Sequence, residues 1–251
     1  MDPTWNDARI QFNDTSKMTN RDSNEVDPAN NAPIVAPLRY SPAVWTDAEI
    51  RMVDGGLDFD HKLTGNTRML KPATDQDNQV YSTQLFSREG VYIPWTAAET
   101  KDNIPRQVAN IRGPLYNGWN GPTGIAINTY GVNAGADRMQ ETVIHELAHN
   151  WDAESAVWTA WQEASGWTST QPSPDQMANF TVSLDRRWWF ANTASNTFYR
   201  TYGQFNAMED WTTTWEAFRL NRLGRLDAAT AARMAGKFAI VNSFVSQISG
   251  P

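Results

Sequence analysis

The sequence contains no cysteine and only three histidines among its 251 residues, namely His61, His145 and His149. The absence of cysteine excludes disulfides, thiolate metal ligands and a cysteine nucleophile, so a catalytic metal must be held by histidine and carboxylate side chains. This absence does not decide the compartment, because many secreted bacterial proteins also lack disulfides. With so few histidines, two that lie four residues apart need an explanation.

Long apolar runs and dense basic segments are also missing. The longest apolar runs span only a few residues, such as FAIV at 238–241, whereas a membrane-spanning helix needs about 20. The net charge of −7 and the pI near 5.0 argue against a nucleic-acid partner, since phosphate binding needs a basic surface. We therefore expect a soluble protein with no membrane span and no nucleic-acid partner.

The first 44 residues differ in composition from the rest of the chain. Residues 1–44 are rich in Asn, Asp, Thr and Pro, and only the ARIQF segment within them resembles a strand. We interpret them as an N-terminal extension or linker, followed by one main domain over residues 45–251. The opening segment MDPTWNDARI shows no leader peptide. It fits either a cytoplasmic start or a chain that begins downstream of a removed leader, and we favour the second.

The remaining sequence predicts strands first and helices afterwards, which is typical of an α+β domain with a small mixed or antiparallel sheet and a mainly helical C-terminal half. A capping box, Thr46 with Glu49, begins the first helix, which stops at Gly65. Runs rich in aromatic and β-branched residues predict three strands, at 79–86, 90–95 and 123–131. The later helices are predicted from Asp137 through Trp151, over 155–164, from Ser173-Pro174 onward, over 206–223 and over 228–248.

The helix from Asp137 carries the segment HELAH at 145–149. At about 100° per residue, His145 and His149 lie roughly 40° apart on one face, so both imidazoles can reach one ion. Glu146 lies about 100° around the axis, where it can approach a metal-bound water without ligating the metal. This H-E-x-x-H pattern indicates a zinc metallopeptidase; the alternative is two ordinary polar residues. The apolar side of the helix carries Val143, Ile144, Leu147 and Trp151.

The third ligand must be a carboxylate. A metzincin would have Gly and His where this chain has Asp152 and Ser155, and no motif surrounds His61. Spacing alone does not choose among the acids that follow the motif, which are Asp152, Glu154, Glu163, Asp175, Asp185, Glu209, Asp210, Glu216 and Asp227.

A later segment, YGQFNAMEDWTTTWEAFRL at 202–220, places Tyr202 seven residues before Glu209, in the first turn of a predicted helix. Together with HELAH, it resembles the gluzincin metallopeptidases of the anthrax lethal factor-like branch, over about 137–152 and 202–220. The resemblance implies a zincin-type fold and one zinc ion per chain. It also implies metal ligands His145, His149 and Glu209, with Glu146 as general base and Tyr202 as hydrogen-bond donor to the oxyanion.

The chain departs from this family one turn after Glu209. The family has a second Glu there, but this sequence has Thr213, and the EAF segment arrives three residues late with Glu216. The resemblance therefore does not predict which neighbouring side chain supports the metal ligands. Alternatives to Glu209 as ligand are Glu216, Asp210 and Asp185. For Asp152 we expect exposure to solvent rather than a bond to a ligand histidine.

The resemblance predicts a secreted zinc-dependent endopeptidase whose protein or peptide substrate, including glycoproteins, adds a strand at the edge formed by residues 123–131. One alternative is a glycan- or surface-binding module that uses tryptophans of the helical half, although large rings at helical spacing usually belong to the core. Another is an inactive relative with a non-catalytic metal. Calcium at Asp54, Asp58 and Asp60 or at Asp75 and Asp77 matches no calcium loop and is not expected.

Overall fold

The structure, a computed structural model, describes residues 10–21, 38–65, 68–70, 84–96, 116–121, 124–153 and 156–249. The chain forms two compact units, one from Met1–Gly55 and Ser82–Thr142 and the other from Gly56–Tyr81 and Val143–Pro251. Both helices and sheets are present, so the predicted α+β class is confirmed. None of the helices in the described ranges combines the length and apolar character that a bilayer crossing needs.

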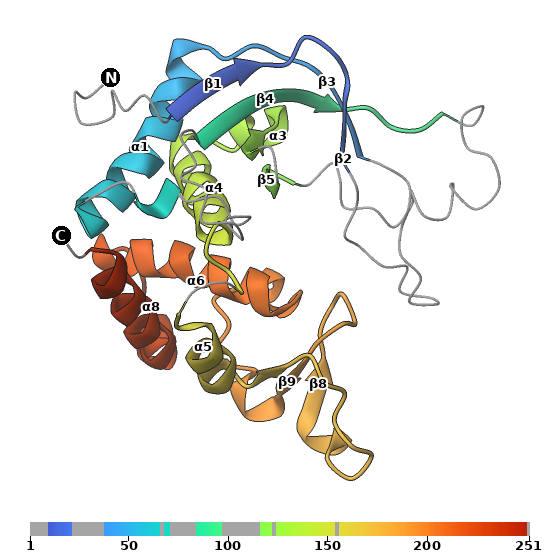
Figure 1. Ribbon diagram of the computed structural model, residues 1–251, viewed down its shortest axis with the longest axis vertical. Helices are drawn as coiled ribbons and strands as arrows, with labels where there is room; N and C mark the ends of the chain where they lie inside the picture. The colour runs from blue at the N-terminus through green and yellow to red at the C-terminus, as the bar shows by residue number, and fades with distance from the viewer. Residues whose placement is uncertain are drawn as a thin grey trace. The chain divides into compact units, whose positions relative to one another are not determined.

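The first unit is built on a mixed six-stranded sheet (Figure 1). Its main path runs β2-β3-β4-β6-β5, and β1 pairs in parallel with β4 off this path. The first half of β4 pairs with β1 and its second half with β3, while β6 runs parallel to its middle. The strands are β1 (Ile10–Asp14), β2 (Thr19–Arg21), β3 (Leu38–Pro42), β4 (Gln84–Tyr92), β5 (Gly118–Gly121) and β6 (Gly124–Ile127).

Three of these strands come from the segment that the sequence predicts to be an extension or linker. β1, β2 and β3 all belong to the sheet, so the predicted boundary near Val44 falls inside the first unit. Phe12 of β1 stacks on Phe86 of β4 with ring centroids 5.6 Å apart, and Leu38 of β3 is fully buried. The linker interpretation is therefore corrected for the described part of residues 1–44.

β4 is one continuous strand, whereas the sequence predicts two strands separated by a turn. The polar residues read as a turn keep their ladder positions, since Ser87 pairs with Asn13 and Arg88 with Asp14. Arg88 is buried, and its guanidinium donates to Glu49 at 3.0 Å. Polar residues thus occupy the middle of a central strand because charge partners are available there; residues 79–83 of the first predicted strand lie outside the described residues.

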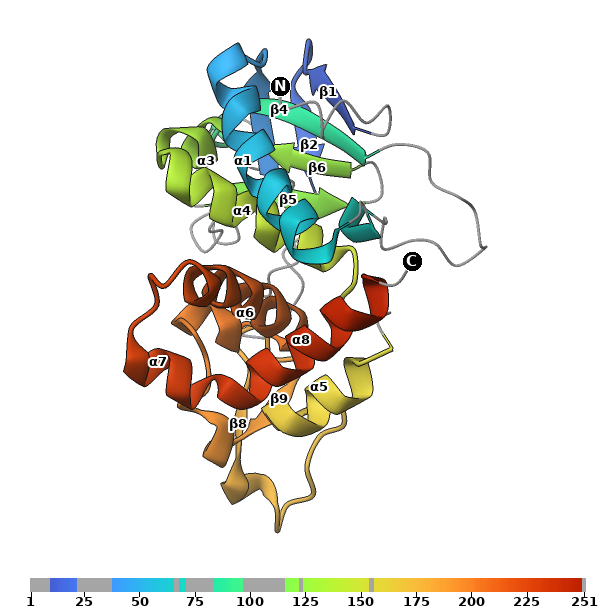
Figure 2. The ribbon, with the colours of Figure 1, turned by 90° about the vertical axis from the view of Figure 1, so that its left-hand side faces the viewer.

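Helix α1 (Asp47–Thr64) confirms the helix predicted from the capping box. The backbone N–H of Glu49 donates to Thr46 Oγ1 at 3.3 Å, and that of Thr46 donates to Glu49 Oε2 at 2.9 Å. Within the first unit α1 lies beside α4 (Ala136–His149) (Figure 2). A Cβ at Gly55 would lie 2.3 Å from Gln140 Nε2, so the glycine permits this close approach.

The strand predicted at 123–131 is shorter than expected. β6 ends at Ile127, and the Asn128 side chain then accepts the Gly131 N–H at 3.0 Å, which starts the short helix α3 (Thr129–Asn133). β6 also pairs with β4 on one side and β5 on the other. It is therefore an interior strand, and the prediction that it forms a sheet edge is wrong.

The second unit is mainly helical. Its helix α8 packs against both α5 and α6 (Figure 2). Trp161, Trp211 and Trp215 are fully buried in its main core cluster, together with Phe244. The helices are α5 (Trp158–Ser165), α6 (Ala207–Arg222), α7 (Ala228–Arg233) and α8 (Ala235–Ile248).

Two helix predictions in this unit need correction. After Ser173-Pro174 no long helix follows: the Ser173 hydroxyl bonds to Gln176 at 2.9 Å and closes a turn, and the chain enters a three-stranded sheet of order β7-β9-β8. The helix predicted over 228–248 is divided into α7 and α8 at Met234, whose φ and ψ are −99° and 2°. The small sheet consists of β7 (Trp167–Thr168), β8 (Phe180–Val182) and β9 (Trp189–Ala191).

Candidate metal centre

The HELAH segment lies on the last turns of α4, as the sequence predicts. Ile144, Leu147 and Ala148 are fully buried and hold the helix in place. The imidazoles of His145 and His149 lie side by side, with ring centroids 5.0 Å apart. The predicted separation into an apolar side and a histidine side is therefore confirmed.

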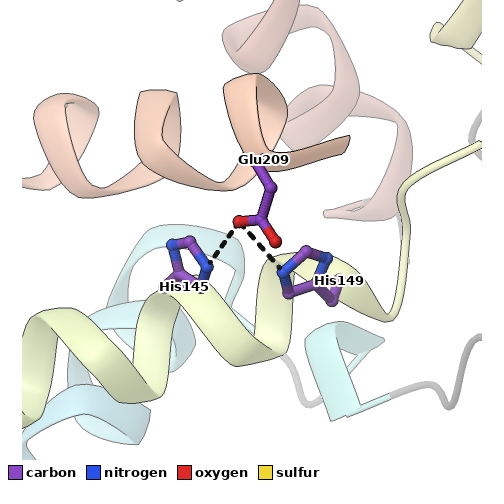
Figure 3. A group of neighbouring side chains, drawn as sticks. All are labelled: His145, His149 and Glu209. Atoms are coloured by element: carbon purple, nitrogen blue, oxygen red, sulfur yellow. Dashed lines mark ion pairs between the residues drawn. The ribbon is translucent and has the colours of Figure 1, made fainter. Parts of the chain in front are cut away.

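Helix α6 brings Glu209 to these two imidazoles (Figure 3). Asn206 caps the helix by accepting the backbone N–H of Glu209 at 2.8 Å, which fixes the first turn. Glu209 Oε2 lies 3.2 Å from Nε2 of His145 and 3.7 Å from Nε2 of His149. One donor atom from each of the three residues lies within 4.8 Å of the others, so this mostly buried group could hold a metal ion.

The other nitrogen of each imidazole is held by a carboxylate. Nδ1 of His145 lies 2.8 Å from Glu216 Oε1, and Nδ1 of His149 lies 2.8 Å from Asp152 Oδ2. A neutral imidazole that donates through Nδ1 keeps the lone pair on Nε2, the nitrogen near Glu209. Metal-ligating histidines are commonly oriented in this way. The expectation that Asp152 faces solvent is therefore wrong.

Glu216 supplies the carboxylate that the sequence lacks at Thr213. Its side chain is 1% exposed, and it accepts hydrogen bonds from His145 and from Arg200. The spacing of the two glutamates predicts this position of Glu216. Residues seven apart on a helix lie about 20° apart, so Glu216 shares a face with Glu209. No local pattern pointed to Arg200. Thr213 instead donates from its hydroxyl to the Glu209 carbonyl at 2.8 Å.

The other acids that were candidates for the third ligand have different partners. Asp210 pairs with Lys237, and Asp185 accepts hydrogen bonds from Ser183 and Asn206. Across the described ranges, the two histidines with Glu209 make up the only group of this kind. Thus Asp54, Asp58 and Asp60 form no such group, while Asp75 and Asp77 lie outside the described residues.

The buried charges of the centre shift one another's titration. Burial raises the pKa of Glu146, and the charges of His145 and His149 offset this only in part. Burial also raises the pKa of Glu209, but the charge of His149 and a hydrogen bond from His145 outweigh this and bring the pKa below its ordinary value. For His149, burial lowers the pKa, but the Glu209 charge and the Asp152 hydrogen bond raise it well above its ordinary value.

Tyr202 lies beside this group on the short 3-10 helix η6 (Thr201–Gln204). Its ring centroid is 6.0 Å from that of His145 and 5.9 Å from that of Phe205, on which it stacks. The guanidinium carbon of Arg200 lies 5.2 Å from the Tyr202 ring centroid. The structure thus brings the predicted tyrosine next to a predicted ligand.

The eight tryptophans of the helical half belong to the packing of the second unit. Four are buried and four are partly buried, and none of the eight is exposed. This agrees with the expectation that most are core residues and gives no support to an exposed tryptophan platform. The buried ones are Trp161, Trp167, Trp211 and Trp215, and the partly buried ones are Trp151, Trp158, Trp188 and Trp189.

Compared with models of protein families, with curated proteins and with solved structures, the chain shows no match.

Proposed function

We propose that the protein is a zinc-dependent endopeptidase of the gluzincin type, with His145, His149 and Glu209 as metal ligands. The observation that carries this proposal is the convergence of one Glu209 oxygen on Nε2 of both histidines, at 3.2 and 3.7 Å. The buried Glu146 directly after His145 is a second support. A purely structural zinc site has no use for an acid beside its ligand and closes its fourth position with a protein group.

The donor set fits zinc better than the hard cations. Two imidazole nitrogens and one carboxylate oxygen form the ligand set of several catalytic zinc sites, whereas calcium and magnesium take oxygen ligands. The carboxylates of Glu216 and Asp152 fix the orientation of both rings. Zinc bound here would supply a Lewis acid for the peptide carbonyl and would lower the pKa of a bound water.

Glu146 is the general base in this proposal. Burial raises the pKa of its carboxyl towards the range in which a base can both accept and return a proton. It would take a proton from the attacking water and deliver it to the nitrogen of the leaving amine. Glu146 follows His145 in the sequence, and the charges of the ligand residues affect its pKa. It is nevertheless not a member of the ligand group.

Tyr202 would donate a hydrogen bond to the oxygen that gains negative charge as water attacks the carbonyl. The stacking on Phe205 and the guanidinium of Arg200 hold its ring beside His145. The substrate would be a protein or peptide. If it adds a strand to the six-stranded sheet, it does not add at the predicted edge at 123–131, because β6 lies between β4 and β5.

Substitution Glu146→Gln tests this function. We expect the variant to keep about one zinc per chain and to cleave casein about 10²- to 10⁴-fold more slowly than the parent, because only the base is lost. The matched control is Glu163→Gln, which changes an exposed glutamate of α5 and should leave cleavage unchanged. Retained cleavage in Glu146→Gln contradicts the base assignment, and a zinc-loaded parent without cleavage indicates an inactive relative.

A further inference from the structure

The residue next to the proposed ligand Glu209 takes part in a buried ion pair. Asp210 is fully buried and Lys237 of α8 is 3% exposed, and the Lys237 ammonium lies 2.7 Å from both carboxylate oxygens of Asp210. Trp167 of β7 adds a third bond, donating from Nε1 to Asp210 Oδ2 at 2.9 Å. Three directional bonds from two other elements thus hold one side chain in the first turn of α6.

Aromatic rings enclose the ammonium of this pair. Lys237 Nζ lies 4.4 Å from the ring centroid of Phe198 and 5.4 Å from that of Trp161. Such an environment offers little hydration, so the charges depend on each other and on these rings. Gly203 packs closely against α6 near Asp210. A Cβ at this position would lie only 2.8 Å from Thr213 Oγ1 and 3.5 Å from Asp210 Oδ1.

Stability alone is a weak reason for such a pair. The cost of removing two charges from water is similar to the gain from their attraction, and apolar residues of like volume are often as stabilising. What a bidentate pair adds is direction. Successive helix residues point about 100° apart, so fixing Asp210 towards α8 also fixes the direction in which Glu209 leaves the helix.

We propose that Lys237 and Asp210 are positioning residues that lock the rotation of the first turn of α6, so that Glu209 presents its carboxylate to His145 and His149. This inference rests on the proposed metal centre. The Asn206 cap sets where the helix begins, and the Lys237–Asp210 pair sets how its first turn is rotated. Both are needed because Glu209 must meet two imidazoles with one oxygen.

The test is the zinc affinity of the Asp210→Asn/Lys237→Met double variant, measured in folded protein by competition with a chelator. The double change removes both charges while keeping volume, so no unpaired charge is left in the core. We expect zinc binding to weaken about 10- to 100-fold and the visible spectrum of the cobalt-substituted protein to change, because the ligand geometry is altered. A merely structural pair would move the unfolding midpoint and leave the affinity of the folded protein unchanged.

The matched control is Arg222→Met, which removes another bond between the same two helices. Arg222 donates to Asn242 of α8 at 2.7 Å, but the pair is exposed and lies at the far end of α6. The zinc affinity of Arg222→Met should equal that of the parent. If the double variant does not fold, Trp167→Phe takes its place. It removes the third bond to Asp210 and also makes the ring that packs on Phe190 and Phe198 smaller, and a several-fold loss of affinity is expected.

The outcomes separate this inference from the function itself. An unchanged zinc affinity in the folded double variant, or in Trp167→Phe where the double variant does not fold, overturns the positioning role alone. A parent that binds zinc without cleaving protein leaves the positioning role in place and refutes the peptidase. A parent that binds no zinc overturns both.

Discussion

Glu216 Oε1 lies 2.8 Å from Nδ1 of His145, while Glu209 approaches Nε2 of the same ring at 3.2 Å. Two carboxylates of one helix therefore hold opposite nitrogens of one imidazole. The arrangement divides their roles, because only the nitrogen that carries the lone pair can bind a metal. Glu209 is on the ligand side, and Glu216 is the group that orients the ring.

This division predicts unequal effects of the two isosteric changes. Glu216→Gln should weaken zinc binding about 10- to 100-fold, since the ring loses its anionic partner but keeps all three ligands. Glu209→Gln should weaken it more, because a ligand is replaced. Competition with a chelator, carried out on both purified variants, shows which of the two binds zinc more weakly. The reverse order would make Glu216 the ligand and would contradict the assignment.

Tyr202→Phe should slow peptide hydrolysis without removing the metal. The ring packing against His145 and Phe205 does not need the hydroxyl, so the fold and the zinc content should stay as in the parent. Loss of one donor to the developing oxyanion costs about 10²- to 10³-fold in kcat. Steady-state kinetics with a fluorogenic peptide separate kcat from KM, and an unchanged kcat would show that Tyr202 only packs.

Asp60 of α1 predicts a pH dependence of stability. It is 2% exposed, neither of its carboxylate oxygens has a hydrogen-bond partner among the described residues, and burial raises its pKa well above 3.8 despite the charge of Arg219. Because the folded state keeps a proton that the unfolded state releases, this group favours folding at low pH, and its contribution is lost as the pH rises through the folded pKa. Asp60→Asn removes this loss.

We therefore expect the free energy of unfolding of Asp60→Asn, relative to the parent, to increase as the pH rises above 3.8. The increase is at most about 1.4 kcal/mol per pH unit and ends at the folded pKa. Denaturant titrations between about pH 4 and 8 measure it. Asp58→Asn is the control, because Asp58 is partly exposed and pairs with Lys62; a pH-independent difference for Asp60→Asn would refute the argument.

Local signals in the sequence were sufficient for α1 and for the two helices that carry the centre, α4 and α6. The Thr46–Glu49 box, the Asn206 cap and the apolar side of α4 act within one or two turns, and the structure has each of them. The HELAH spacing is equally local. These features were predictable because the residues that decide them are neighbours in the sequence.

The remaining features depend on distant partners. The ARIQF segment resembles a strand by itself, but the place of β1 in the sheet depends on its pairing with β4, more than 70 positions later. The sequence leaves Arg88 between two predicted strands, because its partner Glu49 lies in another element. Asp152 was expected in solvent since its bond to His149 forms only after α4 has ended. Tertiary contacts decided these positions, and no periodicity encodes them.

The most direct test of the account is an anomalous difference map collected at the zinc edge from crystals of the zinc-loaded protein. We predict one peak per chain, bound by Nε2 of His145, Nε2 of His149 and a Glu209 oxygen at about 2.0–2.2 Å. Absence of a peak at this group, or a peak bound by Glu216 or Asp152 in place of Glu209, would contradict it.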